Sequence, residues 1–243
     1  AMLAACGWWQ PAAQCVSGAP LYDPCCGSGT IVIEAAQLAL GIAPGGQRRF
    51  GFERLLPFRA EDWVAIKQEA RNPVMASDTV RIFGSDVAHR MVDFAQRNAQ
   101  RAGVAAALQL RGGDALQRLP PASEPGVLLL NPPYGERIAV AGVAGDSPRR
   151  ERAGRERFVS PGANTTDASA DTPDTGDAFF ARLATHWKTH YAGWTAWLLT
   201  PDRHLPARLR LTATRRVPLW NGPIECRLLR FDITGRHDPK SGV

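Results

Sequence analysis

The sequence predicts an α/β fold with a mostly parallel central sheet and a closing antiparallel hairpin. Short apolar runs alternate with longer helical stretches, which is typical of βαβ units. Near the end of the chain, two strand-like runs meet at the turn residues Asn221, Gly222 and Pro223. The length of 243 residues and the hydrophobic content of 44% allow a large core, and we expect one principal domain.

The first half of the chain contains the clearest alternation. A short strand, "PLYDP" (20–24), leads through a glycine-rich turn to an apolar helix, "IVIEAAQLAL" (31–40). Residues 41–79 interrupt the rhythm as an insertion that includes a helical stretch, "AEDWVAIKQEARN". The strand "VRIFGSD" (80–86) then precedes a helix with Met91, Phe94 and Ala95 on one face and Gly103 as its stop.

The later elements follow the same logic. "ALQLRGGD" (107–114) and "GVLLLNPPYG" (126–135) each contain a strand that ends at turn residues. Residues 139–177 are poor in large apolar side chains, so we expect a mobile loop there. The remaining segments are predicted as a helix, a strand, a short helix and the two hairpin strands: "AFFARLATHWKTHY", "GWTAWLLTP", "DRHLPARL" and "RRVPLWNGPIECRLLRFDI". Residues 1–19 are expected to form a helical lead-in.

Polar residues stand at the carboxyl ends of four predicted strands, namely Asp23, Asp86, Asp114 and Asn131. Ligands of parallel sheets bind at this edge, so the four side chains should converge on one site. The turn "CCGSGT" has neither the lysine of a phosphate-binding loop nor the G-x-G-x-x-G pattern. Its glycines instead favour close backbone approach to a ligand without a pyrophosphate.

Three acids at one edge suit an adenosine that carries a cationic amino-acid tail. We expect Asp86 to accept hydrogen bonds from ribose hydroxyls, Asp114 to lie near the adenine, and the loop from Asp23 to Thr30 to hold the amino-acid end. S-adenosylmethionine is such a molecule. The predicted cofactor-binding residues are Asp23, Cys26, Gly27, Ser28, Gly29, Thr30, Asp86, Asp114 and Asn131.

The motifs "DPCCGSGT", "FGSD", "GGDA" and "NPPYGER" stand in the order typical of the class I, Rossmann-like methyltransferases that modify exocyclic amino groups. "NPPYGER", the insertion with "RRFGFE" and the "NGPIEC" hairpin most resemble the bacterial 23S rRNA guanine-N2 methyltransferases that carry an N-terminal THUMP domain. The resemblance implies a methyltransferase domain over 20–243 and an rRNA substrate. No THUMP domain is evident in these residues, so we expect weak RNA capture without it.

The resemblance also assigns the catalytic residues Asn131, Pro132, Pro133 and Tyr134. An aryl amine is a poor nucleophile. If the Asn131 side-chain oxygen and the Pro132 carbonyl each accept an amino hydrogen, the developing positive charge is stabilised. Pro133 stiffens the loop, and Tyr134 offers a ring for the extruded base. Alternative functions are an adenine-N6 DNA methylase, a tRNA guanine-N2 methyltransferase, and an RNA-binding scaffold without activity.

Several other patterns in the sequence have simpler structural interpretations. His186 and His190 have the spacing of a metal pair, but the pattern lacks its glutamate and a third ligand, so no metal is expected. Cys25 and Cys26 have no identifiable histidine partner, and loop packing is preferred over nucleophilic catalysis. The arginine-rich run 149–157 either binds a phosphate backbone or is a solvated segment. Packing in the core or hairpin is expected for Trp8, Trp9, Trp194, Trp197 and Trp220.

The amino-acid composition indicates the charge of the partner and the cellular compartment. The 29 basic and 23 acidic residues give a net charge of +6, which favours a polyanionic partner. Five cysteines without a C-x-x-C pair fit neither a disulfide framework nor a zinc ribbon, and they indicate a reducing, cytoplasmic location. No apolar run approaches the roughly 18 residues of a membrane helix, so no membrane partner is expected.

Overall fold

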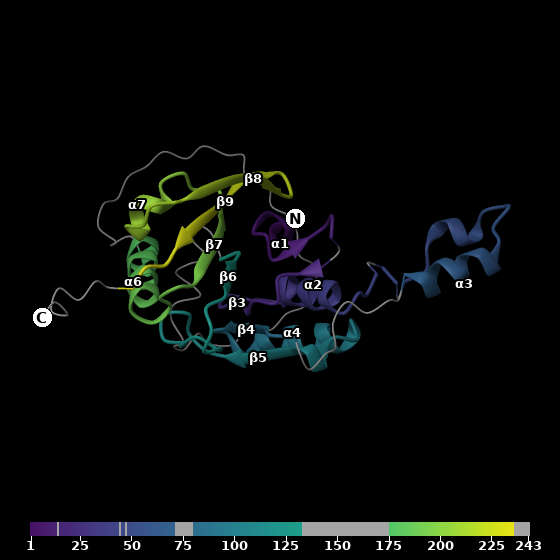
Figure 1. The fold of residues 1–243 in the computed structure, drawn as a ribbon, viewed down its shortest axis with the longest axis horizontal. Coiled ribbons are helices and arrows are strands. Elements are labelled where there is room, and N and C mark those ends of the chain that lie inside the picture. Colours follow the sequence, from purple (N-terminus) through teal and green to yellow (C-terminus); the bar gives the residue numbers. More distant parts are fainter. Residues whose placement is uncertain (14, 44, 47, 71–79, 133–174, 236–243) are drawn as a thin grey trace, which may run out of the picture.

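The fold is built around a seven-stranded sheet with helices on both faces (Figure 1). The computed structural model describes residues 1–13, 15–43, 45–46, 48–70, 80–132 and 175–235. The strand order is β5-β4-β3-β6-β7-β9-β8. The sheet strands are β3 (Leu21–Asp23), β4 (Ile82–Asp86), β5 (Leu108–Gly112), β6 (Val127–Leu130), β7 (Thr195–Thr200), β8 (Arg215–Asn221) and β9 (Ile224–Asp232).

Five adjacent strands run parallel, and a hairpin closes the sheet: β9 runs in the opposite direction, and β8 is antiparallel to β9. β3 pairs with both β4 and β6, β4 pairs with β5, and β6 pairs with β7, all in parallel. β9 runs antiparallel to β7 and to β8. The strand order reverses between β3 and β6, which is the position where open α/β sheets bind ligands. The predicted parallel sheet with a closing hairpin is therefore confirmed.

Helices cover each face because side chains alternate along the strands. On one face, Leu21, Ile82 and Leu129 pack against α2 (Thr30–Ala39) and α4 (His89–Arg101). On the other face, α6 (Thr175–His190) and α7 (Leu205–Leu209) cover a second set of buried side chains, which includes Tyr22, Phe83, Leu128, Leu198, Leu229 and Phe231. α4 ends at Arg101, followed by Gly103 with φ +72°, as the sequence predicted.

The N-terminal segment differs from the expected helical lead-in. Only α1 (Met2–Ala5) is helical, and β1 (Trp9–Gln10) pairs antiparallel with β2 (Cys15–Val16). Leu3 and Trp8 bury their side chains with α2, and the Trp8 indole donates to the Ala19 carbonyl at 2.9 Å. Tertiary packing therefore holds this segment, because strands of two residues cannot be stable alone.

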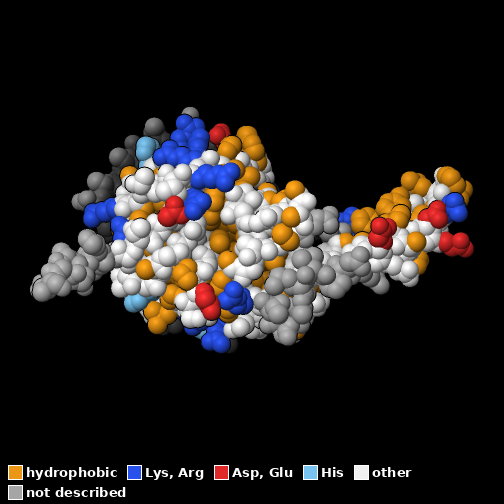
Figure 2. Space-filling view, viewed as in Figure 1, with side chains coloured by type: hydrophobic (Ala, Val, Ile, Leu, Met, Phe, Trp, Pro, Cys, Tyr) orange, Lys and Arg blue, Asp and Glu red, His pale blue; other side chains and the backbone are white. Residues whose placement is uncertain are grey.

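An arm projects from the body on the side of α2 and α4 (Figure 1). It contains η1 (Gly51–Arg54) and α3 (Ala60–Glu69), both within the expected insertion. Phe50 and Phe52 each contact the Trp63 ring edge to face, at centroid distances of 5.6 and 5.0 Å. Figure 2 shows hydrophobic side chains at the surface of the arm. The large apolar side chains exposed in this segment are Phe52, Leu55, Leu56, Val64 and Ile66. A short helix η3 (Ala105–Ala107) precedes β5 in the body.

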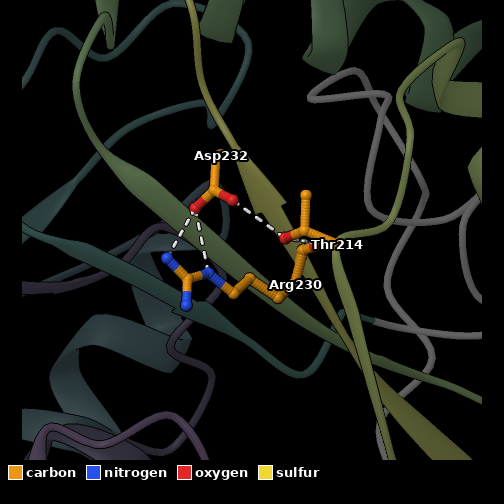
Figure 3. A network of polar contacts seen from close by, with 3 residues as sticks. All are labelled: Thr214, Arg230 and Asp232. Atoms are coloured by element: carbon orange, nitrogen blue, oxygen red, sulfur yellow. Dashed lines mark hydrogen bonds and ion pairs between the residues drawn. The ribbon is translucent and has the colours of Figure 1, made fainter.

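The base of the β8–β9 hairpin is held by a polar network (Figure 3). Asp232 accepts hydrogen bonds from Thr214 Oγ1 at 2.9 Å and from Arg230 Nε at 2.9 Å. Desolvation raises the pKa of Asp232, but the hydrogen bonds from Thr214 and Arg230 and the positive charge of Arg230 together outweigh it, so its pKa lies below the ordinary value. Arg230 also lies over the Trp197 ring, with 5.9 Å between Cζ and the ring centroid. The hairpin base is thus fixed to β7.

Candidate active site

Two hydrogen bonds join the loop between β3 and α2 to the end of β4, and a third lies within the loop. Asp23 is only 2% exposed, and its Oδ1 accepts from the Cys25 amide at 3.0 Å. The Cys26 amide donates to the Ser85 carbonyl at 2.9 Å, and the Gly27 amide donates to Asp86 Oδ2 at 2.9 Å. The first two strand ends therefore form one rigid edge.

The two loop glycines have different surroundings, although both adopt positive φ. At Gly27 (φ +53°), a Cβ would meet only the Met91 Cε atom, at 3.9 Å. At Gly29 (φ +88°), a Cβ would lie 3.0 Å from the Cβ of Ala95. Gly29 therefore permits close packing of the loop on α4, whereas Gly27 leaves its backbone approachable, as a bound ligand would require.

Asp86 connects the loop to the third strand end. Its Oδ1 accepts from the Ala88 amide at 2.9 Å, and its carbonyl accepts from the Gly113 amide at 2.9 Å. An ionised carboxylate has about four acceptor positions, so the contacts with the Ala88 and Gly27 amides leave capacity for a ligand hydroxyl. Asp114 follows Gly113, and its Oδ1 accepts from the Leu116 amide at 2.9 Å.

The negative charges of all three predicted acids act on the Cys25 thiol. Burial raises the pKa of the Cys25 thiol well above its usual value, and the negative charges of Asp23, Asp86 and Asp114 raise it further. Burial also raises the pKa of Asp23 to about 7, and the charge of Asp86 adds to this effect. A thiol held protonated in this way is a poor nucleophile, which agrees with the packing interpretation of Cys25.

The end of β6 lies at the switch point beside β3. Leu21 pairs with Val127 and Tyr22 with Leu128, so Asn131 follows at the same edge as Asp23. The Asn131 side chain is exposed, and Pro132 is buried. Pro133, Tyr134 and the arginine-rich run 149–157 lie outside the described residues.

The remaining predicted loop residues lie on the same stretch. Cys26 is buried, and its thiol pKa is raised mainly by burial and further by the charges of Asp23 and Asp86. Ser28 is half-buried, and Thr30 is exposed at the first turn of α2. The structure thus brings the described residues of the predicted cofactor site to one edge, around the start of α2.

These features agree with what comparison of the sequence shows. Residues 1–145 match the family described as "RMKL-like, methyltransferase domain". The chain belongs to this family. It is also similar to the "Ribosomal RNA large subunit methyltransferase K/L" of Psychromonas ingrahamii, with 36% identity over 89% of this chain and 25% of that protein. For the protein of the same name from Shewanella loihica, the identity is 35% over 98% of this chain and 29% of that protein.

The chain spans about a quarter of the length of the curated relatives it matches. Solved structures share the fold of this RMKL-like domain. SMU.472, solved in complex with SAH, has a TM-score of 0.66 and 24% identity over 90% of this chain and 48% of that one. A "predicted N6-adenine-specific DNA methylase" from Listeria monocytogenes has a TM-score of 0.66 and 25% identity over 88% of this chain and 47% of that one. The class I methyltransferase fold expected from the sequence is therefore confirmed.

Several residues that shape the site of this RMKL-like domain were missed by the sequence analysis. The Asn98 side chain on α4 donates from Nδ2 to the Ser28 carbonyl at 2.9 Å and so holds the glycine loop. Under the loop, the Tyr22 and Ser85 hydroxyls are 2.7 Å apart. Asn98 follows the polar pattern of an exposed helix face, so nothing in the sequence marked it.

His186, which the sequence suggested as one half of a possible metal pair, contacts the backbone instead. The His186 ring Nε2 lies 2.7 Å from the Arg118 carbonyl, which also accepts from the Tyr191 hydroxyl at 2.8 Å. Within the described ranges, no group of three or more His, Cys, Asp or Glu side chains is arranged to hold a metal ion. No helix in the described part of the chain is long and apolar enough to cross a membrane.

Proposed function

We propose that this domain transfers a methyl group from S-adenosylmethionine to an exocyclic amino group in rRNA, most specifically N2 of a guanine in 23S rRNA. One observation carries the proposal: three carboxylates at or just after the ends of adjacent parallel strands share one edge of the sheet with the Asn-Pro end of β6, beside the switch point. The names of the similar rRNA methyltransferases support the RNA substrate. A cytoplasmic location belongs to the same proposal, because all five cysteines are free.

The residues present fit the cofactor. Asp23 is a buried carboxylate whose pKa is raised to about 7, so a cationic ammonium group beside it would stabilise its charged form. Asp86 retains acceptor capacity for ribose hydroxyls, and Asp114 lies at the next strand end for the adenine. Gly27 presents open backbone to the amino-acid end. When bound, the cofactor supplies an electrophilic methyl group on a sulfonium.

The chain's own contribution to the reaction is orientation. Asn131 and Pro132 stand directly after a strand whose last three residues are fully buried. A rigid element therefore carries the Asn131 side-chain oxygen and the Pro132 backbone carbonyl. Acceptance of two amino hydrogens by these oxygens would direct the nitrogen lone pair and stabilise the positive charge that develops on it. No general base is assigned: positioning and charge stabilisation serve the transfer, and the methylated nitrogen then releases its extra proton to water. Stacking of the base on Tyr134 is part of the proposal.

A second candidate is methylation of adenine N6 in DNA, which involves the same amino-group chemistry. The similarity to the Listeria structure of that description favours it. Transfer of labelled methyl from S-adenosylmethionine to rRNA fragments and to DNA, followed by nucleoside analysis, distinguishes the two. N2-methylguanosine in rRNA supports the proposal, whereas N6-methyladenine in DNA replaces it. Asp86→Ala serves as the negative control for cofactor-dependent transfer.

RNA capture by a THUMP domain is the remaining part of the proposal. We expect this domain to bind the cofactor by itself, because the described cofactor residues belong to its own strand ends. Addition of a THUMP domain should lower the RNA concentration needed for half-maximal methylation. Equal apparent RNA affinity with and without that domain would contradict this expectation.

A further inference from the structure

The tip of the β8–β9 hairpin exposes a large aromatic side chain. Trp220 is 70% exposed, which corrects the expectation that it packs in the hairpin. It pairs with Glu225 next to the turn at Gly222, beyond the area that the helices cover. The other tryptophans in the sheet region, Trp194 and Trp197, are buried. An indole exposed to water at a hairpin tip offers a flat apolar face on which a ligand ring can stack.

The register of the hairpin places arginines on the same face as Trp220. Successive side chains of a strand alternate between faces, and paired residues share a face. The pairs Trp220–Glu225, Pro218–Arg227 and Arg216–Leu229 therefore lie on one face, in that order from the tip. The intervening residues Val217, Leu219, Cys226 and Leu228 point to the core on the other side. Leu229 on this face is buried under α6 and α7, so it is the uncovered part of the face that carries an aromatic ring followed by two arginines.

The arginines meet α7 and the end of β7 at a small groove of about 200 Å³. It is lined by Arg203, Arg216, Arg227, Asp202, Pro206 and Leu229. The two acids nearby are already paired, since Asp202 Oδ2 lies 3.4 Å from Arg208 Nε and Glu225 Oε1 lies 3.3 Å from an Arg227 nitrogen. Among the described residues, Arg203 and Arg216 are exposed and make no ion pair. Figure 2 shows Lys and Arg side chains gathered over α7 and the hairpin.

This groove lies at the same edge of the sheet as the candidate active site. Arg227 pairs with Thr200, the last residue of β7, and Asp202 follows two residues later. β7 is the parallel neighbour of β6, whose carboxyl end leads to Asn131. The hairpin tip extends past Arg227, so Trp220 projects beyond this edge.

We propose that Trp220, Arg216, Arg203 and Arg227 form a docking surface for a single-stranded RNA segment that flanks the target nucleotide. The inference rests on the proposed function and adds the surface that binds its substrate. The arginines contact phosphates, and the indole stacks on an unpaired base. Arginine charge beside an exposed aromatic ring complements a nucleic acid strand, and stacking requires a base that is not already paired.

Two pairs of variants test the surface. Arg216→Gln is compared with Arg215→Gln, because these neighbours are both exposed but project from opposite faces of β8. Trp220→Ala is compared with Trp220→Phe, which retains a ring for stacking. The protein's affinity for a labelled single-stranded rRNA fragment is measured by fluorescence anisotropy at several salt concentrations. Thermal melting and cofactor affinity are measured for all four variants, to show that the fold and the cofactor site are intact.

We expect Trp220→Ala to weaken RNA binding by about 5- to 150-fold, the range for one lost base stack, and Trp220→Phe to restore most of it. Arg216→Gln should reduce the slope of log affinity against log salt by about 0.7, as for one phosphate contact of a single strand, whereas Arg215→Gln should leave it unchanged. Wild-type RNA affinity in both Trp220→Ala and Arg216→Gln would overturn the proposal and point to another occupant, such as a protein. Tighter binding of single-stranded DNA of the same sequence would overturn the commitment to RNA.

A methyl-transfer assay of the unmodified protein shows whether a negative result contradicts the docking surface or the proposed function. If the unmodified protein methylates rRNA but the variants bind RNA normally, the docking surface is ruled out and the proposed function stands. If the variants lose RNA binding but the unmodified protein does not methylate rRNA, the proposed function is ruled out and the docking surface stands.

Discussion

Replacement of Asp23 by asparagine should make the protein more stable without cofactor and weaken cofactor binding. Burial raises the pKa of Asp23 from 3.8 to about 7, with a further contribution from the charge of Asp86. A carboxyl with a raised folded-state pKa contributes most to stability at low pH, and this contribution is lost as the pH rises from about 4 to about 7. The loss is on the order of 4 kcal/mol at pH 8, and an uncharged amide avoids it.

The same carboxylate determines how cofactor affinity depends on pH. A cationic ammonium binds the ionised form of Asp23, so affinity should rise with pH until the pH exceeds about 7. If only that form binds, the apparent dissociation constant at pH 6 is about tenfold larger than at pH 8. In Asp23→Asn, binding should be weak at both pH values, and this tenfold change should be absent.

Calorimetric titration of S-adenosylhomocysteine at pH 6, 7 and 8 tests this reasoning, together with thermal melting of the free protein. Any ionisation of the ligand itself is common to both titrations, so the informative quantity is the difference between the wild type and the variant. Asp93→Asn is the matched control, because Asp93 is an exposed carboxyl on α4. The reasoning is refuted if Asp23→Asn and the wild type show the same change of affinity with pH.

Four further predictions address the same edge of the sheet. Asp86→Ala should weaken cofactor binding by about 1.5–3 kcal/mol, because hydrogen bonds to a charged group are lost, and an unchanged calorimetric affinity would exclude its assigned role. Asn131→Ala should lower turnover by roughly 10²–10³ with little change in cofactor affinity, as measured by single-turnover methylation; loss of cofactor binding instead would indicate a structural role. Cys25→Ala should retain methyl transfer, because the raised pKa keeps the thiol protonated, and complete inactivation at wild-type stability would contradict this. Gly29→Ala should lower the melting temperature, because φ is +88° and the new Cβ would lie 3.0 Å from Ala95; a melting temperature equal to that of the wild type would contradict the packing argument.

Much of the fold could be predicted from the sequence because its signals are local. The β6 strand is a continuous apolar run that ends at Asn131 and two prolines, and α4 has a 3.6-residue apolar period that ends before Gly103. Acids at strand ends of a parallel sheet must share an edge whatever the details of packing. For this reason the gathering of Asp23, Asp86 and Asp114 followed from the order of elements alone.

Features that depend on contacts between distant elements were decided only by the tertiary structure. The pairing of Trp9–Gln10 with Cys15–Val16 has too few residues to leave a periodic signal. The Asn98 contact with Ser28 joins residues 70 positions apart, and the packing of Gly29 on Ala95 depends on how closely α2 approaches α4.

The exposure of Trp220 is the clearest example of a feature that could not be predicted from the sequence. The sequence determined that a hairpin would form and that side chains would alternate along it. Which face the helices cover, and where that cover ends, depends on how α6 and α7 pack against the sheet. The indole extends past that cover, so a residue that local pattern assigns to packing is exposed beside two arginines of the same face.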